Sequence, residues 1–163
     1  MRHTITLLLS NEVGALTRVA GLFSARGYNI ESLTVAPTEE PSLSRMTIAT
    51  SGSNAVLQQV VKQLKKLVDV VDVMDLTEDA HLERELMLLK CIAKGSMREE
   101  VKRLADIFRA NIVDVTDESY VVELTGTASK LDSFIAAVGR EQIVELARSG
   151  VTSVARGSSS LHL

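Results

Sequence analysis

Apolar residues recur at helical spacing in four separate stretches of the chain. The sets are Leu16, Val19, Ala20 and Phe23; Leu57, Val60, Val61 and Leu64; Val101, Leu104, Ala105 and Phe108; and Leu131, Phe134, Ile135 and Val138. Positions i, i+3, i+4 and i+7 lie on one face of an α-helix, so each set predicts a helix with one buried stripe.

Runs of β-forming residues lie between the predicted helices. They cover residues 4–9, 30–35, 44–50 and 70–76, and then 86–92, 112–115, 120–125 and 143–147. The order of elements is therefore βαββαβ, twice, with the charged stretch 77–84 as the junction. We expect an α+β protein of two ferredoxin-like domains, residues 1–78 and 79–163.

The run 44–50 alternates, with Met46 and Ile48 on one side of the strand. The other face of this sheet would carry Thr6, Leu8, Arg45, Thr47 and Ala49. That face needs cover, because a domain of roughly 75 residues buries little surface on its own. Pairing with a second copy of the chain, edge to edge or face to face, is the simplest remedy.

Composition and charge narrow the range of partners. Hydrophobic residues make up 45% of the 163 residues and aromatic residues only 3%, so the core must be aliphatic. The net charge of -3 gives no general attraction to nucleic acid or anionic lipid. RNA-recognition domains of this fold class stack bases on aromatic residues of the central strands, and residues 4–9 and 44–50 contain none. We therefore expect no nucleic-acid partner.

The single cysteine and the lack of long apolar runs bear on location. Cys91 has no partner for a disulfide and fits a reducing compartment. No segment approaches the roughly 18 apolar residues of a membrane span, and the apolar run after Met1 is too short for a signal peptide. We expect a cytoplasmic protein that does not associate with membranes.

Catalytic and metal-binding patterns do not emerge from the sequence. The three histidines, His3, His81 and His162, show no metal-ligand spacing. Cys91 lies in the apolar run 86–92 and fits a core thiol better than a nucleophile. Since no nucleophile, base and orienting group occur together, we expect no catalytic residue, no metal site and no enzymatic activity.

The turn after the first strand has the features of a pocket for a small zwitterion. A helix N-terminus offers unpaired N–H groups and partial positive charge to a carboxylate. Gly14, at the start of that helix, removes a side chain where a ligand would approach the backbone. Asn11 and Asn29 each carry a donor and an acceptor without net charge. The walls for a small apolar side chain would come from Ala15, Leu16 and Ile30.

Residue spacing alone also allows these residues to have a purely structural role without any ligand, and it favours that interpretation. Asn11 also fits a helix cap, Gly14 a helix-start glycine and Asn29 a turn residue. Phosphate binding fits less well, because this loop has neither a glycine-rich phosphate motif nor a lysine.

Two motifs carry a resemblance to a known family. NEVGAL at 11–16 and RGYNIESLTVAPT at 26–38, followed by SRMTI at 44–48, resemble the ACT domain of the acetohydroxyacid synthase (acetolactate synthase) small subunit. EREL at 83–86 and ARSGV at 147–151 continue the similarity, which covers essentially the whole chain.

The resemblance implies a regulatory subunit in the synthesis of valine, isoleucine and leucine. Such a subunit activates a separate, thiamine-diphosphate-dependent catalytic subunit and confers feedback inhibition by valine. Thiamine diphosphate, Mg²⁺ and FAD are expected on that large partner, and no cofactor on this chain. ACT domains would pair in a homodimer, so that the valine site exists only in the dimer. The implied ligand residues are Asn11, Gly14, Ala15 and Leu16 of one chain and Asn29 and Ile30 of its partner.

Two other classes of function remain open at this level. A stand-alone module would sense an amino acid and act on a different partner. A purely structural assembly subunit would bind no ligand.

Overall fold

The computed structural model describes residues 1–163, which form two compact units. The first consists of Met1–Leu82 together with Val151–Leu163, and the second of Glu83–Gly150. The C-terminal segment Val151–Leu163 thus packs with the first unit, whereas the sequence analysis assigned it to the second domain. A domain division at residues 78 and 79 stays a prediction.

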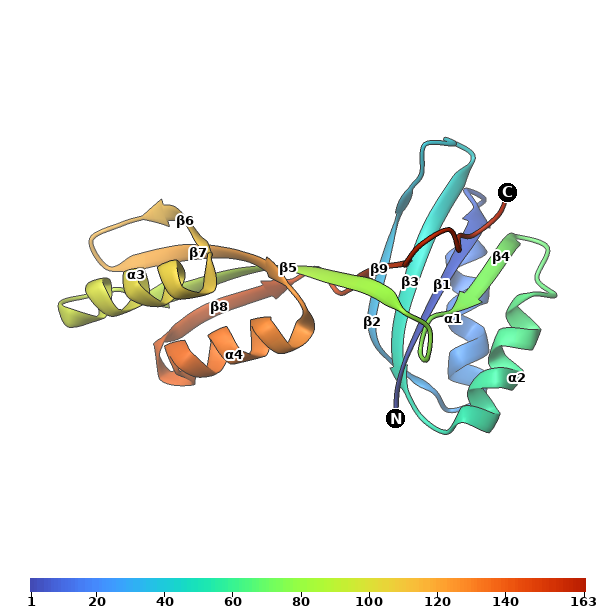
Figure 1. Cartoon of the computed structure of the whole chain (residues 1–163), viewed down its shortest axis with the longest axis horizontal. Helices are drawn as coiled ribbons and strands as arrows, with labels where there is room; N and C mark the ends of the chain where they lie inside the picture. The colour runs from blue at the N-terminus through green and yellow to red at the C-terminus, as the bar shows by residue number, and fades with distance from the viewer. The chain divides into compact units, whose positions relative to one another are not determined.

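The first unit has the expected βαββαβ order. Its elements are β1 (Arg2–Ser10), α1 (Ala15–Ala25), β2 (Asn29–Pro37), β3 (Leu43–Ser51), α2 (Asn54–Leu64) and β4 (Val70–Asp75). The antiparallel sheet has the order β2-β3-β1-β4, and both helices lie on one of its faces (Figure 1). This is the ferredoxin-like arrangement, as predicted.

The core of the first unit follows from strand register. Ile5 pairs with Ile48 and Leu7 with Met46, so these side chains point to the helical face and are fully buried. The helices contribute most of their predicted stripes, chiefly Val19, Phe23, Leu57, Val60 and Leu64, whereas Leu16 is exposed. The apolar alternation predicted for residues 44–50 is confirmed.

The opposite face of this sheet is covered by β9 (Thr152–Ala155), a strand that the sequence analysis did not predict. Figure 1 shows β9 crossing this face, and Thr6, Leu8, Thr47 and Ala49 are all buried. Hydrogen bonds that hold the C-terminal segment include Arg45 Nη2 to Ser153 O (2.6 Å), Arg156 N to Ala80 O (2.9 Å) and His162 N to Asp72 Oδ2 (2.9 Å). The chain itself therefore provides the cover that we expected from a second copy on this face.

The second unit repeats the same order of elements. They are β5 (His81–Ile92), α3 (Ser96–Phe108), β6 (Asn111–Val115), β7 (Ser119–Gly126), α4 (Ala128–Val138), a short 3-10 helix (Arg140–Gln142) and β8 (Ile143–Arg148). The strand order β6-β7-β5-β8 matches that of the first sheet. Met87, Leu89 and Cys91 are fully buried in its core, where Phe108 meets Phe134 edge to face with ring centroids 5.2 Å apart. The predicted fold class is confirmed.

All four predicted α-helices are present, and they are short. α1, α2 and α4 have 11 residues each and α3 has 13. Each buries one stripe of apolar side chains against its sheet. No helix combines the length and apolarity that a membrane crossing requires.

Candidate functional site

The turn between β1 and α1 ends in a left-handed residue. Gly14 has φ 85° and ψ -4°, a conformation that favours glycine, and no side chain caps the helix after it. Ala15 N donates to Glu12 O (3.2 Å) and Arg18 N to Gly14 O (3.0 Å). The amides of Leu16 and Thr17 have no acceptor within the chain. The start of α1 therefore presents free donors and partial positive charge to solvent.

Asn11 is tied to the loop between β2 and β3. Its Nδ2 donates to Pro41 O (2.7 Å), its Oδ1 accepts from Ser44 Oγ, and its backbone N donates to Ser42 O (2.9 Å). Asn11 thus has a structural role, but it is not the helix cap that spacing left open, because no side chain caps α1. An amide group retains a second N–H and a second lone pair, so these bonds do not use up its capacity toward a ligand.

Arg18 lies directly over Gly14. A side chain added at Gly14 would have its Cβ 3.0 Å from Arg18 Nη1. Arg18 Nε donates to Asp69 Oδ2 (2.5 Å), and this carboxylate, which is buried, raises the pKa of Arg18. We did not single out this ion pair from the sequence. The spacing of four residues between Gly14 and Arg18, which puts them on one helix face, was the available signal.

The apolar residues at this turn differ in exposure. Ala15 is 2% exposed and belongs to the core, so in the single chain its side chain lines no open surface. Val13 is 99% exposed and Leu16 is 43% exposed. Two unpartnered apolar side chains therefore flank the free amides of α1.

Asn29 and Ile30 lie at the far end of the same sheet. Ser10 pairs with Leu43, whereas Asn29 pairs with Ser51 at the other end of β3. The 11 residues of α1 lie between the two groups and span roughly 16 Å at about 1.5 Å per residue. The single chain therefore does not bring the six predicted ligand residues together.

Local structure at the start of β2 is irregular. Asn29 O accepts a hydrogen bond from Thr50 Oγ1 (2.5 Å), and its side chain is exposed. A register shift between Ile30 and Ser32 leaves Glu31 as a bulge opposite β3. Bulges of this kind redirect side chains at sheet edges and near binding sites.

The other groups considered for chemistry lie elsewhere. Cys91 is fully buried, and burial raises the pKa of its thiol, while Sγ lies 3.8 Å from Tyr120 O. A thiol in this state is a poor nucleophile. No three His, Cys, Asp or Glu side chains are grouped so that they could hold a metal ion.

Comparison with known proteins covers both units. Residues 5–72 match the family described as the AHAS small subunit-like ACT domain, and residues 84–157 match the small subunit of acetolactate synthase. The chain is 56% identical to the acetolactate synthase small subunit of Haemophilus influenzae over 162 residues, 99% of either chain. It is 58% identical to the small subunit of acetolactate synthase isozyme 3 of Escherichia coli over 158 residues, which are 96% of this chain and 97% of the relative.

A solved structure agrees with these matches. The crystal structure of the acetolactate synthase small subunit from Thermotoga maritima superposes with a TM-score of 0.88 at 37% identity. The superposition covers 98% of this chain and 99% of that one.

Proposed function

The chain belongs to the family of acetolactate synthase small subunits, and from this premise we propose that it activates the catalytic subunit of that enzyme and confers feedback inhibition by valine. A small subunit of this family is a regulatory, non-catalytic part of branched-chain amino acid synthesis. Thiamine diphosphate, Mg²⁺ and FAD would then belong to the large catalytic partner.

The observation that supports a valine site is the open start of α1. A valine carboxylate would accept hydrogen bonds from the free amides of Leu16 and Thr17, where the helix dipole also favours negative charge. Gly14 lets the ligand approach the backbone, and Arg18 adds a nearby positive charge that Asp69 partly balances. The exposed Leu16 side chain would contact the isopropyl group.

A two-fold dimer would complete this site. β2 is an edge strand of its sheet, so its outer backbone groups are open for pairing. In an antiparallel pairing about a two-fold axis, the Asn11 end of one sheet meets the Asn29 end of its partner. The amide of Asn29 and the apolar Ile30 would then close the pocket from the second chain.

Regulation would follow from linkage. Valine that binds one arrangement of the paired domains more tightly shifts the population toward that arrangement. A difference of about 1.4 kcal/mol in binding free energy changes the equilibrium tenfold. The arrangement favoured by valine would be the one that activates the catalytic subunit less.

The substitution Gly14→Asp tests this site. Aspartate tolerates the left-handed conformation better than most residues, at a cost of about 1 kcal/mol, and its carboxylate would lie beside Arg18. The new charge would occupy the place of the valine carboxylate. We expect at least a tenfold loss of valine affinity by calorimetry, with the fold and the activation of the catalytic subunit retained.

Gly157→Asp is the matched control. Gly157 also has a positive φ (71°), no atom of the chain lies within 4 Å of an added Cβ, and it lies in the same unit. It should bind valine normally. Normal valine binding by Gly14→Asp would show that the start of α1 is not the carboxylate site. Co-purification of the native chain with a large thiamine-diphosphate enzyme tests the partner separately.

A further inference from the structure

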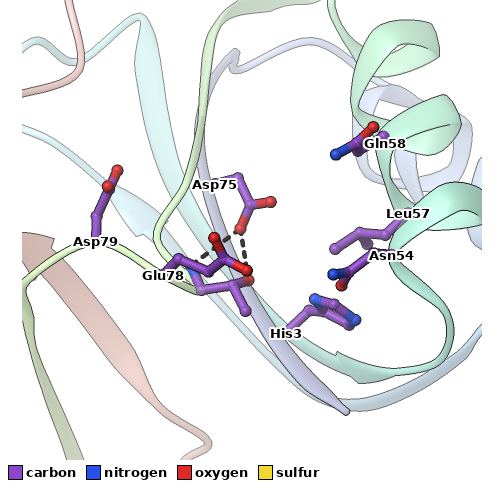
Figure 2. A pocket seen from close by; sticks show the side chains of 8 residues that line it. His3, Asn54, Leu57, Gln58, Asp75, Glu78 and Asp79 are labelled. Atoms are coloured by element: carbon purple, nitrogen blue, oxygen red, sulfur yellow. Dashed lines mark hydrogen bonds between the residues drawn. The ribbon is translucent and has the colours of Figure 1, made fainter.

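The first unit contains a second hollow, at the β4 edge of its sheet, whereas β2 forms the other edge. Its volume is about 220 Å³. Figure 2 shows Asp75 and Glu78 across from the α2 residues Asn54 and Gln58, with the ring of His3 below them. No lysine or arginine is among its lining residues. The hollow therefore presents mainly hydrogen-bond acceptors and negative charge.

The base of this hollow is an incompletely paired histidine. His3 is only 1% exposed, and its Nε2 lies 3.1 Å from Gly52 O. A carbonyl oxygen can only accept, so in the neutral ring Nε2 carries the proton and Nδ1 is left as an acceptor. Nδ1 is buried and has no hydrogen-bond partner. The chain thus supplies no hydrogen-bond donor to His3 Nδ1. Leaving this buried acceptor unpaired costs roughly 1–3 kcal/mol.

The carboxylates of Asp75 and Glu78, like His3 Nδ1, need hydrogen-bond donors as partners. Asp75 Oδ1 accepts from Thr77 N (3.0 Å) and Thr77 Oγ1 (2.5 Å), which fixes the side chain and leaves Oδ2 available. Glu78 lines the same hollow, as Figure 2 shows. His3, Asp75 and Glu78 thus all contribute acceptors to the lining of one hollow.

We propose that this hollow binds a primary ammonium group on a short apolar stem. An ammonium carries three N–H donors, and His3, Asp75 and Glu78, which all line the hollow, offer acceptors for them. Leu57 would contact the carbon stem, and Asn54 and Gln58 would border the entrance. The His, Asp and Glu side chains are not grouped as metal ligands, so an organic donor fits better than a metal ion. This site does not depend on the proposed valine site.

The test uses the full chain labelled with ¹⁵N-histidine and followed by NMR. n-Propylammonium chloride should shift the His3 Nδ1 resonance in a saturable way. Tetramethylammonium carries the same charge but no N–H, and it should leave the resonance unmoved. Nα-acetyl-lysine methylamide distinguishes the source of the ligand: a stronger response to it than to n-propylammonium identifies a protein lysine, and an equal or weaker one a free amine.

Variants distinguish binding of n-propylammonium in this hollow from a general attraction of the cation to negative charge. Asp75→Asn should weaken n-propylammonium binding about tenfold or more, because a charged hydrogen-bond partner is lost. Glu78→Gln, which does not touch the Thr77 turn, gives the same test if Asp75→Asn folds poorly. Asp114→Asn, on an exposed strand of the second unit, should bind normally.

Three results would overturn the proposal. They are equal shifts with both cations, a proton on His3 Nδ1 in the free protein, and tighter binding of Zn²⁺ than of n-propylammonium. The variant Gly14→Asp should keep its response to n-propylammonium whether or not it binds valine. Failure at one site is thereby distinguishable from failure at the other.

Discussion

At Glu85, a nearly buried carboxylate accepts hydrogen bonds from three donors. They are Arg148 Nε (3.0 Å), Arg148 Nη2 (2.9 Å) and Gly150 N (3.2 Å). Arg148 Nη1 also donates to Asp132 Oδ1 (2.7 Å), and hydrogen bonding to Glu85 is the main cause that raises the pKa of Arg148. This single side chain thus joins β5 to the end of β8 and the turn after it.

Replacing Glu85 with glutamine tests how much this pair stabilises the second unit. The change leaves the Arg148 charge without its bidentate partner, although Asp132 and partial exposure reduce the penalty. We expect the free energy of unfolding to fall by about 2 kcal/mol, measured by urea denaturation with circular dichroism. Asp106→Asn breaks the exposed pair with Lys102 and should cost less than about 0.5 kcal/mol. Equal losses in the two variants would contradict a special role for Glu85.

At the level of elements, β9 has a role out of proportion to its four residues. It buries one face of the first sheet, and Val151 just before it is 2% exposed. The cover is imperfectly paired, because Thr6 Oγ1, Arg45 Nε and Ser153 Oγ are buried without partners. These three atoms therefore add nothing to the hydrogen bonds that hold the segment, and the burial of Val151 contributes an apolar term.

Two substitutions separate apolar from polar contributions of this segment. Val151→Asp places a charge in the apolar contact and should destabilise the cover by about 3 kcal/mol. Ser153→Ala removes an unpaired hydroxyl and should change stability by less than about 0.5 kcal/mol or stabilise slightly. Hydrogen exchange of β1 and β3 amides measures both effects. Slow exchange in Val151→Asp would mean that the sheet does not depend on this cover.

At the level of the whole molecule, the proposed valine site depends on assembly. Asn11 and Asn29 lie at opposite ends of one sheet, so a pocket that uses both residues, as we propose, would need two chains. A two-fold dimer would then hold two equivalent pockets. By linkage, a ligand that binds only the dimer must also stabilise the dimer.

Sedimentation velocity at a series of protein concentrations tests this dependence. Valine should shift the monomer–dimer equilibrium of the native chain toward the dimer, and apparent valine affinity should rise with protein concentration. Gly14→Asp should dimerise as the native chain does but show no valine effect. Full-strength valine binding by dilute monomer would contradict a pocket shared between chains.

Local patterns predicted the fold well, for a physical reason. The stripe of Leu131, Phe134 and Val138 specifies a helix because helix periodicity depends only on neighbours in sequence. The strand β9 was not predicted, because residues 152–155 are too few to establish an alternation of apolar and polar side chains. The ion pair of Arg18 with Asp69 joins residues 51 positions apart and has no local signature beyond the helix spacing.

The sequence by itself determined the two βαββαβ units, their aliphatic cores, the glycine at the start of α1 and the family to which the chain belongs. These depend on periodicity, residue type and motif, which are local properties. Only the tertiary structure decided that Asn11 pairs with the β2–β3 loop, that β9 covers the first sheet, and that His3 Nδ1 lies unpaired in the hollow that Asp75 also lines. Each of these depends on which distant residues meet across strands, and local composition does not encode that information.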